Sequence, residues 1–177
     1  MSKRKPRFIT GNFYHIYNRG VVKLPIFIND QDYRKFCSQI FKNERKYGEV
    51  KMYCYCLMPN HFHILVKQLV SDGISLFLHR LLVGYTAYFN YKYERTGHVF
   101  EGRTKCSFIN SKGSFIEVSR YIHRNPLKIL QADDDILRYE FSSFVFYVTN
   151  IIAERSFLLS LFDNDPKKYE RFVLFDQ

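Results

Sequence analysis

Apolar residues along the chain follow two spacings, one typical of strands and the other of amphipathic helices. Residues 13–17 and 53–66 are rich in strand-favouring side chains, and the second run contains a Pro-Asn turn, which predicts a strand and a hairpin. Residues 30–46 and 74–93 place apolar side chains three and four positions apart, which predicts two helices. Residues 99–109 again have strand character. The predicted order is therefore strand, helix, hairpin, helix, strand.

That order is the split βαβ arrangement, and it predicts an α+β protein with a ferredoxin-like fold. In such a fold a four-stranded antiparallel sheet carries two helices on one face and leaves the other face for a ligand. On an open sheet of this type the ligand is often a nucleic acid. The fold alone does not determine the function, so the chemistry has to come from individual residues.

A third helix is expected over residues 111–125, close to the sheet. Ser114 and Glu117 have the spacing of a capping box at its start. Pro126 disfavours helical geometry at the residue before it, and we expect the helix to end there.

Beyond this helix the periodicity weakens, and the remaining chain is expected to form a helical C-terminal extension. Its helices are predicted at residues 151–162 and 167–175. We therefore expect a functional domain over residues 1–126, with residues 127–177 packed on the same domain.

Positive charge is concentrated in the first two-thirds of the chain. The chain contains 27 Lys and Arg against 17 Asp and Glu, a net charge of +10. Lys and Arg predominate in residues 1–126, whereas acidic residues predominate in residues 127–177. This gradient favours a polyanion as the partner of the first region, with a merely basic surface as the alternative.

The cysteines and the N-terminus bear on the compartment. Cys37, Cys54, Cys56 and Cys106 contain no CxxC pair, which favours neither a disulfide framework nor a zinc site and indicates a reducing environment. The N-terminus lacks the apolar run of a signal peptide, and no apolar segment is long enough to span a bilayer. We therefore expect a cytoplasmic protein that does not bind membranes.

The predicted hairpin carries two histidines with a distinctive spacing. His61 and His63 are two positions apart on a strand, so their side chains share one face and Phe62 points to the other. Two neighbouring imidazoles can bind one metal ion. The alternative is an interior strand with two hydrogen-bonded histidines.

The third helix places a tyrosine near an amide. Glu117, Tyr121 and Asn125 are four positions apart and share a helix face. If this helix packs beside the hairpin, Asn125 could complete a metal site with the two histidines, close to Tyr121. A metal ion polarises a phosphodiester, and a phenol can attack it to form a covalent intermediate. The alternative for Tyr121 is an ordinary core or surface side chain, and we interpret His123, on the opposite side, as structural.

Taken together, these motifs resemble the single-tyrosine HUH transposases. Residues 57–66, LMPNHFHILV, resemble the HUH signature, which is a histidine, a bulky hydrophobe and a histidine. Residues 119–126, SRYIHRNP, resemble the family's nucleophile helix. Residues 13–20 and 97–103 are similar to its first and fourth strands, and residues 142–144 to a later Ser-Ser-aromatic element. Within this family the chain is most similar to the REP-associated tyrosine transposases.

The resemblance implies a metal-dependent, single-stranded DNA endonuclease and strand transferase. It implies that His61 and His63 are metal ligands, that Asn125 is the third ligand, and that Tyr121 is the nucleophile. It further implies Mg²⁺ or Mn²⁺ as the metal, single-stranded or hairpin DNA as the substrate, and a 5′-phosphotyrosine link beside a free 3′-hydroxyl. A monomer and a homodimer both remain open.

A set of basic side chains is expected to contact DNA phosphates. Four lie on an N-terminal arm, three lie on the first and fourth predicted strands, and two flank Tyr121. Arg103 and Lys105 alternate on the fourth strand and can face one way, and Arg103 is also a candidate for reading bases. The set comprises Lys3, Arg4, Lys5, Arg7, Arg19, Arg103, Lys105, Arg120 and Arg124.

Two other functions remain as alternatives. A noncatalytic nucleic-acid-binding module of the same fold would need neither Tyr121 nor a metal. A related HUH replication or conjugation nuclease would use an early tyrosine, for which Tyr14 and Tyr17 are the candidates. The chain also departs from the family pattern. Phe141 stands where Trp is usual, and residues 127–131 differ from the common Val-Arg-Ala-Gly pattern. Neither departure is expected to touch the chemistry.

Overall fold

A four-stranded antiparallel sheet forms the centre of the protein. The computed structural model describes residues 8–131, 135–149, 151 and 156–175. The strand order is β2-β3-β1-β4, and each neighbouring pair is antiparallel. This confirms the predicted ferredoxin-like fold. The strands are β1 (Phe13–Arg19), β2 (Val50–Met58), β3 (His61–Gln68) and β4 (Lys105–Ile109).

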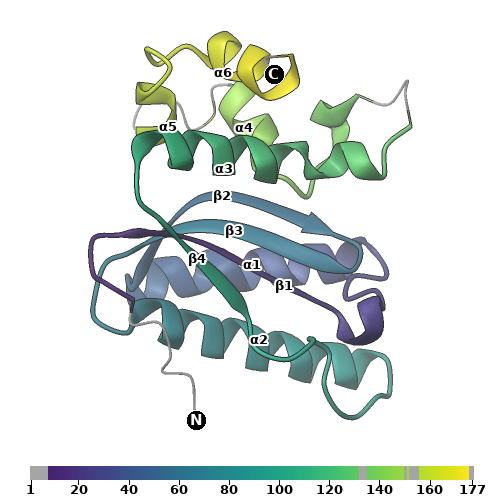
Figure 1. The fold of residues 1–177 in the computed structure, drawn as a ribbon. Helices are drawn as coiled ribbons and strands as arrows, with labels where there is room; N and C mark the ends of the chain where they lie inside the picture. The colour runs from purple at the N-terminus through teal and green to yellow at the C-terminus, as the bar shows by residue number, and fades with distance from the viewer. Residues whose placement is uncertain (1–7, 132–134, 150, 152–155, 176–177) are drawn as a thin grey trace.

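Two long helices, α1 (Asp30–Tyr47) and α2 (Gly73–Lys92), cover one face of the sheet (Figure 1). Their apolar stripes bury Phe36 and Leu81 against Phe62 and Ile64 of β3, and all four side chains are fully buried. This core fixes the orientation of β3, because alternate residues of a strand point to opposite faces. His61 and His63 must therefore face the other side.

On that other side a third helix, α3 (Lys112–Arg124), runs over the sheet (Figure 1). Its Phe115 and Ile122 form a second core with Cys54, Cys56 and Leu65 of β2 and β3. The helix therefore covers part of the face that the sequence left for a ligand, and it brings its own side chains onto the sheet.

The start of α3 differs from the prediction. Ser111, not Ser114, is the N-cap residue, and its hydroxyl accepts a hydrogen bond from the Ser114 backbone N–H at 3.0 Å. Ser114 lies within the first helical turn, so the predicted capping box with Glu117 is wrong. The end is as expected, since Pro126 follows directly and the chain continues as a 3₁₀ turn, η2 (Asn125–Lys128).

The fourth strand is shorter than predicted. Residues 99–104 do not extend the ladder of β4. Phe100 instead forms an isolated bridge with Gly20, and Gly102 adopts a left-handed conformation with φ of 55°. A reversal at Gly102 separates this segment from the strand. Arg103 therefore lies before β4 and does not alternate with Lys105 on it, which corrects the prediction.

The C-terminal segment packs against α3 and β2. The helices α4 (Phe144–Val148) and α6 (Pro166–Leu174) place Phe144 and Tyr169 in the second core. Ser143 joins the segment to the sheet edge, because its hydroxyl accepts a hydrogen bond from the Tyr55 backbone N–H at 2.8 Å. The predicted division of domains after residue 126 stays a prediction.

Shorter elements complete the chain. The helix predicted at 151–162 is observed as α5 over four residues, and residues 152–155 lie outside the described part. Among the residues that the structure describes, none of the helices has the length and apolar character needed to cross a bilayer. The remaining elements are η1 (Val21–Lys23), η3 (Ile136–Arg138) and α5 (Phe157–Ser160).

His123 gives the fold a specific dependence on pH. Its ring is fully buried and hydrogen-bonded to the Tyr169 hydroxyl at 2.6 Å and the Ser143 hydroxyl at 2.8 Å. Burial lowers the pKa of His123 from 6.5 to about 3. The unfolded chain thus binds a proton that the folded chain excludes, so this contribution to stability is complete above pH 6.5 and declines as the pH falls toward 3.

We expect His123 alone to lower the free energy of unfolding by about 2 kcal/mol at pH 5 relative to pH 7. Urea denaturation at both pH values, with His123→Gln beside the wild type, measures it. The variant should lose less stability than the wild type between the two values, because glutamine retains polar groups but does not titrate in this range. Equal losses in both proteins would assign the pH dependence to other groups.

Candidate active site

The two histidines of β3 lie side by side on the face of the sheet that α3 crosses. In the antiparallel register Tyr17 is opposite His63 and Arg19 is opposite His61, so these four side chains share one face. Phe62, between the histidines, is fully buried on the other face. The predicted geometry of the His-x-His pair is therefore the geometry observed.

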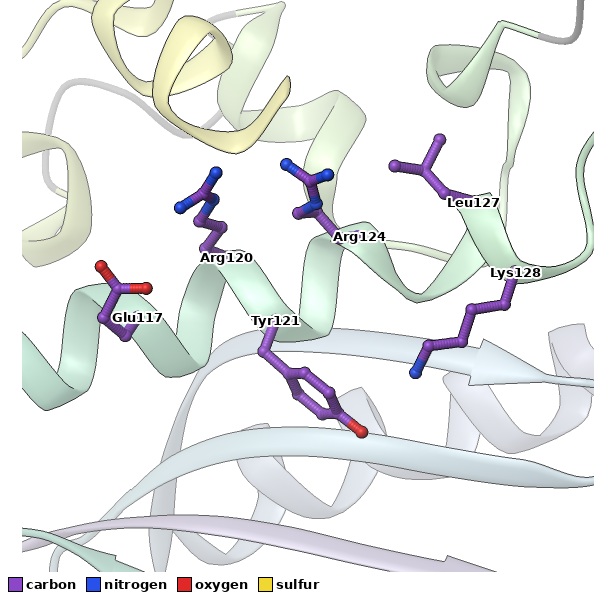
Figure 2. Close-up of a pocket in the computed structure, with 6 residues that line it drawn as sticks. All are labelled: Glu117, Arg120, Tyr121, Arg124, Leu127 and Lys128. Carbon is purple, nitrogen blue, oxygen red and sulfur yellow. The ribbon is translucent and has the colours of Figure 1, made fainter. Parts of the chain in front are cut away.

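Tyr121 reaches this pair from the helix above. Figure 2 shows its side chain extending from α3 toward the sheet. Its ring meets the His63 ring edge to face, with centroids 5.3 Å apart, and lies 5.9 Å from the His15 ring. The side chain is not part of a core, since Tyr121 is 46% exposed. The predicted convergence of the tyrosine and the histidine pair thus occurs within one chain.

A cavity of about 530 Å³ opens at this point. Tyr121, His61 and His63 contribute to its wall together with three predicted DNA-contacting residues, Arg19, Arg103 and Lys105. Tyr17 and Lys23 also line it. The cavity therefore joins a candidate nucleophile and paired imidazoles with positive side chains that suit a phosphate backbone.

Hydrogen bonds fix both imidazole rings. The Nδ1 atom of His61 lies 2.7 Å from the Asn60 amide oxygen, and because that oxygen can only accept, Nδ1 carries the proton. The Nδ1 atom of His63 lies 2.9 Å from Nε2 of His15. Such contacts orient metal-binding histidines and leave the opposite ring nitrogen for the ion.

The surroundings keep these imidazoles neutral. Burial lowers the pKa of His15 to about 4. It also lowers the pKa of His63 to about 2, with smaller effects from His15, His61 and Lys128. Burial likewise lowers the pKa of His61, against an opposing hydrogen bond with Asn125. A neutral imidazole is the form that binds metal ions, so the rings are ready for a ligand at pH 7.

Asn125 lies where α3 passes into η2, and its side chain is fully buried. Its Nδ2 atom donates to the Tyr121 backbone carbonyl at 2.8 Å, which directs the amide oxygen away from the helix. That oxygen accepts a hydrogen bond from the Lys128 ammonium at 2.9 Å. A hydrogen bond with His61 places the amide beside that ring.

Two imidazole nitrogens and one amide oxygen form a donor set that fits a divalent cation. Across the described residues, no group of three or more His, Cys, Asp and Glu side chains is arranged to hold a metal. The Asn125 amide oxygen is the candidate third ligand, and its role stays a prediction. His15 is not a candidate ligand here, because its Nε2 atom contacts the Nδ1 atom of His63.

The predicted DNA-contacting residues separate into groups. Arg19 lines the cavity and pairs with Glu101, with Nη2 and Oε1 3.0 Å apart. Arg103 and Lys105 are exposed at the same cavity. Four further members of the set lie outside the described residues: Lys3, Arg4, Lys5 and Arg7.

Arg120 and Arg124 point away from the sheet, as Figure 2 shows. The Arg124 guanidinium donates to the backbone carbonyl of Val173 at 2.9 Å, near the end of α6. The Arg120 guanidinium lies over the Phe172 ring, 5.0 Å from its centroid. Both side chains thus hold the C-terminal segment on α3, and their contact with DNA stays a prediction.

Two residues of the site escaped the sequence analysis. The sequence predicts His15 only as part of a strand. Its contact with His63 depends on the register between β1 and β3, which long-range pairing sets. Lys128 belongs to the segment that is not expected to touch the chemistry, yet the structure brings it to two candidate site residues. Its Nζ atom contacts Asn125 and lies 4.8 Å from the centroid of the Tyr121 ring. The spacing of Tyr121, Asn125 and Lys128, four and then three residues, could have revealed the shared face.

A ferredoxin-like sheet with a His-x-His pair beneath a helical tyrosine defines a transposase of the single-tyrosine HUH class. Residues 12–125 match the family described as IS200-like transposases, and the chain belongs to that family. No match is found among curated proteins.

One solved structure supports the fold. The structure of a REP-associated tyrosine transposase bound to a REP hairpin aligns with a TM-score of 0.67 at 17% identity, covering 86% of this chain and 88% of that one. A candidate transposase from Deinococcus radiodurans R1 aligns with a TM-score of 0.47 at 12% identity, covering 69% of this chain and 96% of that one.

Proposed function

We propose that this transposase is a metal-dependent single-stranded DNA endonuclease and strand transferase whose nucleophile is Tyr121. It acts in the cytoplasm on hairpin-forming repeats. The observation that carries the proposal is the position of Tyr121, whose ring stands edge-on to His63 in a cavity lined by basic residues.

The reaction exchanges one phosphodiester for another. The Tyr121 phenol oxygen attacks phosphorus, the new O–P bond forms, and the bond from phosphorus to the 3′ oxygen breaks. The phenol loses its proton, and the departing oxygen gains one and leaves as a 3′-hydroxyl. The DNA 3′ of the break stays attached as a 5′-phosphotyrosine. Because the energy of the broken bond is retained, a hydroxyl from another strand can reverse the step and join DNA.

His61, His63 and Asn125 would hold the divalent ion, Mg²⁺ or Mn²⁺. When bound, the ion neutralises charge on the phosphate and polarises phosphorus. The protein contributes the orientation of its ligands, since Asn60 and His15 fix the two rings and the α3 backbone fixes the amide. All of these groups come from one chain, so a monomer can form the complete site.

DNA enters along the basic wall of the cavity. Arg103 and Lys105 are exposed there, at the β4 side of the sheet that α3 leaves open. The REP hairpin bound to the structurally similar transposase supports hairpin DNA as the substrate.

An assay with end-labelled hairpin DNA tests the function. The protein is incubated with Mg²⁺ or Mn²⁺ and the products are separated under denaturing conditions. We expect 3′-end-labelled DNA to appear in a covalent protein adduct and 5′-end-labelled DNA to appear as a free fragment. An adduct that carries the 5′ label would reverse the proposed polarity. Absence of any adduct across a panel of hairpins would favour a noncatalytic DNA-binding module.

The basic wall makes a separate prediction for binding. Replacing Arg103 and Lys105 together by glutamine should weaken hairpin binding and lower the slope of log Kd against log salt by roughly 1.4, about 0.7 per charge for a single strand. Fluorescence anisotropy over a salt series measures this slope. A matched double variant of Lys42 and Lys46, exposed on α1 across the sheet, should leave it unchanged. Equal slopes in wild type and the Arg103 and Lys105 variant would place the DNA elsewhere.

A further inference from the structure

Lys128 lies beside the candidate nucleophile, Tyr121, although it is far from the two histidines in the sequence. Pro126 ends α3, and the 3₁₀ turn that follows carries the Lys128 side chain back along the Tyr121 face. Figure 2 shows both side chains extending toward the sheet, while Arg120 and Arg124 extend the other way. The ammonium lies 2.9 Å from the Asn125 amide oxygen and 4.8 Å from the centroid of the Tyr121 ring.

Among the described residues, no carboxylate neutralises the charge of this ammonium. In the described part of the chain no Asp or Glu lies within ion-pair distance of Lys128, whereas Arg19 pairs with Glu101 and Lys92 with Asp32. Within the described part of the chain its side-chain hydrogen bond goes to a neutral amide, which leaves two of its three N–H donors for other acceptors. The ammonium lies beside the tyrosine that is proposed to attack a phosphate. Its charge and its free N–H donors allow it to bind a phosphate oxygen.

We propose that Lys128 is a further catalytic residue, whose ammonium contacts a non-bridging oxygen of the phosphate that Tyr121 attacks. This rests on the function proposed above. Phosphoryl transfer places negative charge on those oxygens, and a positioned donor stabilises it in the transition state. The ammonium donates hydrogen bonds and keeps its protons, so the balance of bonds in the transfer is unchanged.

The amide oxygen that Lys128 contacts is also the proposed third ligand of the metal. The ammonium and a divalent ion would then repel each other across a short distance. Lys128 should therefore weaken metal binding in the absence of DNA while it accelerates cleavage in its presence. These opposite effects distinguish it from a residue that merely holds Asn125 in place.

The test compares Lys128→Met, which removes the charge, with Lys128→Arg, which retains it. Lys42→Met is the matched control, since Lys42 is exposed on α1 across the sheet. The first measurement is the Mn²⁺ affinity of the DNA-free protein, by electron paramagnetic resonance. The second is the single-turnover rate of adduct formation with saturating Mn²⁺ and hairpin DNA.

For Lys128→Met we expect Mn²⁺ to bind about 10-fold more tightly and adduct formation to slow by about 100-fold. Lys128→Arg should restore most of the rate, and Lys42→Met should change neither quantity. Weaker Mn²⁺ binding together with a slower reaction would overturn the proposal in favour of a structural role. An unchanged rate would overturn it as well, with the role of Tyr121 left intact. A wild-type protein that forms no adduct at all would instead reject the function on which the proposal rests.

Discussion

Tyr121→Phe is expected to abolish the covalent attachment of hairpin DNA while folding and DNA binding persist. The substitution removes only the hydroxyl, and the ring keeps its edge-to-face contact with His63. Because the side chain is half-exposed, we expect stability to change by less than about 0.5 kcal/mol. Loss of the attacking oxygen should lower the rate of adduct formation by at least about 1000-fold. Single-turnover assays with labelled hairpin measure this rate.

Two further tyrosine variants make the result specific. Tyr91, which is 89% exposed on α2, provides a matched control, and Tyr91→Phe should react like the wild type. Tyr17 is the competing hydroxyl, because it lines the same cavity and its ring lies 5.6 Å from that of His63. Tyr14 is buried on the opposite face of the sheet. An adduct that survives Tyr121→Phe and disappears with Tyr17→Phe would move the nucleophile to the first strand.

His61→Ala is expected to produce the second large effect, a fall in Mn²⁺ affinity of about 100-fold or more. Mutation of residues that only hydrogen-bond to a metal ligand already lowers metal affinity by about 10- to 100-fold. His61 is the cleaner of the two histidines to replace, because it is only partly buried, whereas His63 is buried against His15. Calorimetric titration of the DNA-free protein measures the affinity. At limiting Mn²⁺ the rate of adduct formation should fall together with the Mn²⁺ affinity.

The control for this variant is His79→Ala, an exposed histidine of α2 on the opposite side of the sheet. It should bind Mn²⁺ as the wild type does. If His61→Ala retained the wild-type affinity, the ion would bind at another place, and the assignment of His61, His63 and Asn125 as ligands would be wrong.

Local periodicity was enough to predict most of the fold. The apolar stripes of α1 and α2, the Pro-Asn turn and the alternation in β3 are each encoded within a few neighbouring residues. The pairing of His61 and His63 on one face follows from strand geometry alone. The structure contains these features because tertiary packing agrees with the local pattern. Phe62, for example, packs in the core and so turns the two histidines to the other face.

The errors arose where longer-range contacts decide the structure. The start of β4 depends on the reversal at Gly102, and the contact between His15 and His63 depends on the register of β1. The hydrogen bond from the Arg124 guanidinium to the end of α6 depends on a segment far along the chain, while the predicted DNA contact of Arg124 stays a prediction. The position of Lys128 likewise depends on the 3₁₀ turn that contains Pro126.

Peptide mapping of the covalent adduct tests the central claim most directly. The adduct is digested with trypsin and nuclease, and the peptides are analysed by mass spectrometry. Tyr121 is the only tyrosine between Lys112 and Arg124, whereas Tyr14 and Tyr17 share the peptide that ends at Arg19. We predict the mass of a phosphonucleotide on the peptide that contains Tyr121. The same mass on the peptide with Tyr14 and Tyr17, and an unmodified Tyr121, would contradict the proposed mechanism.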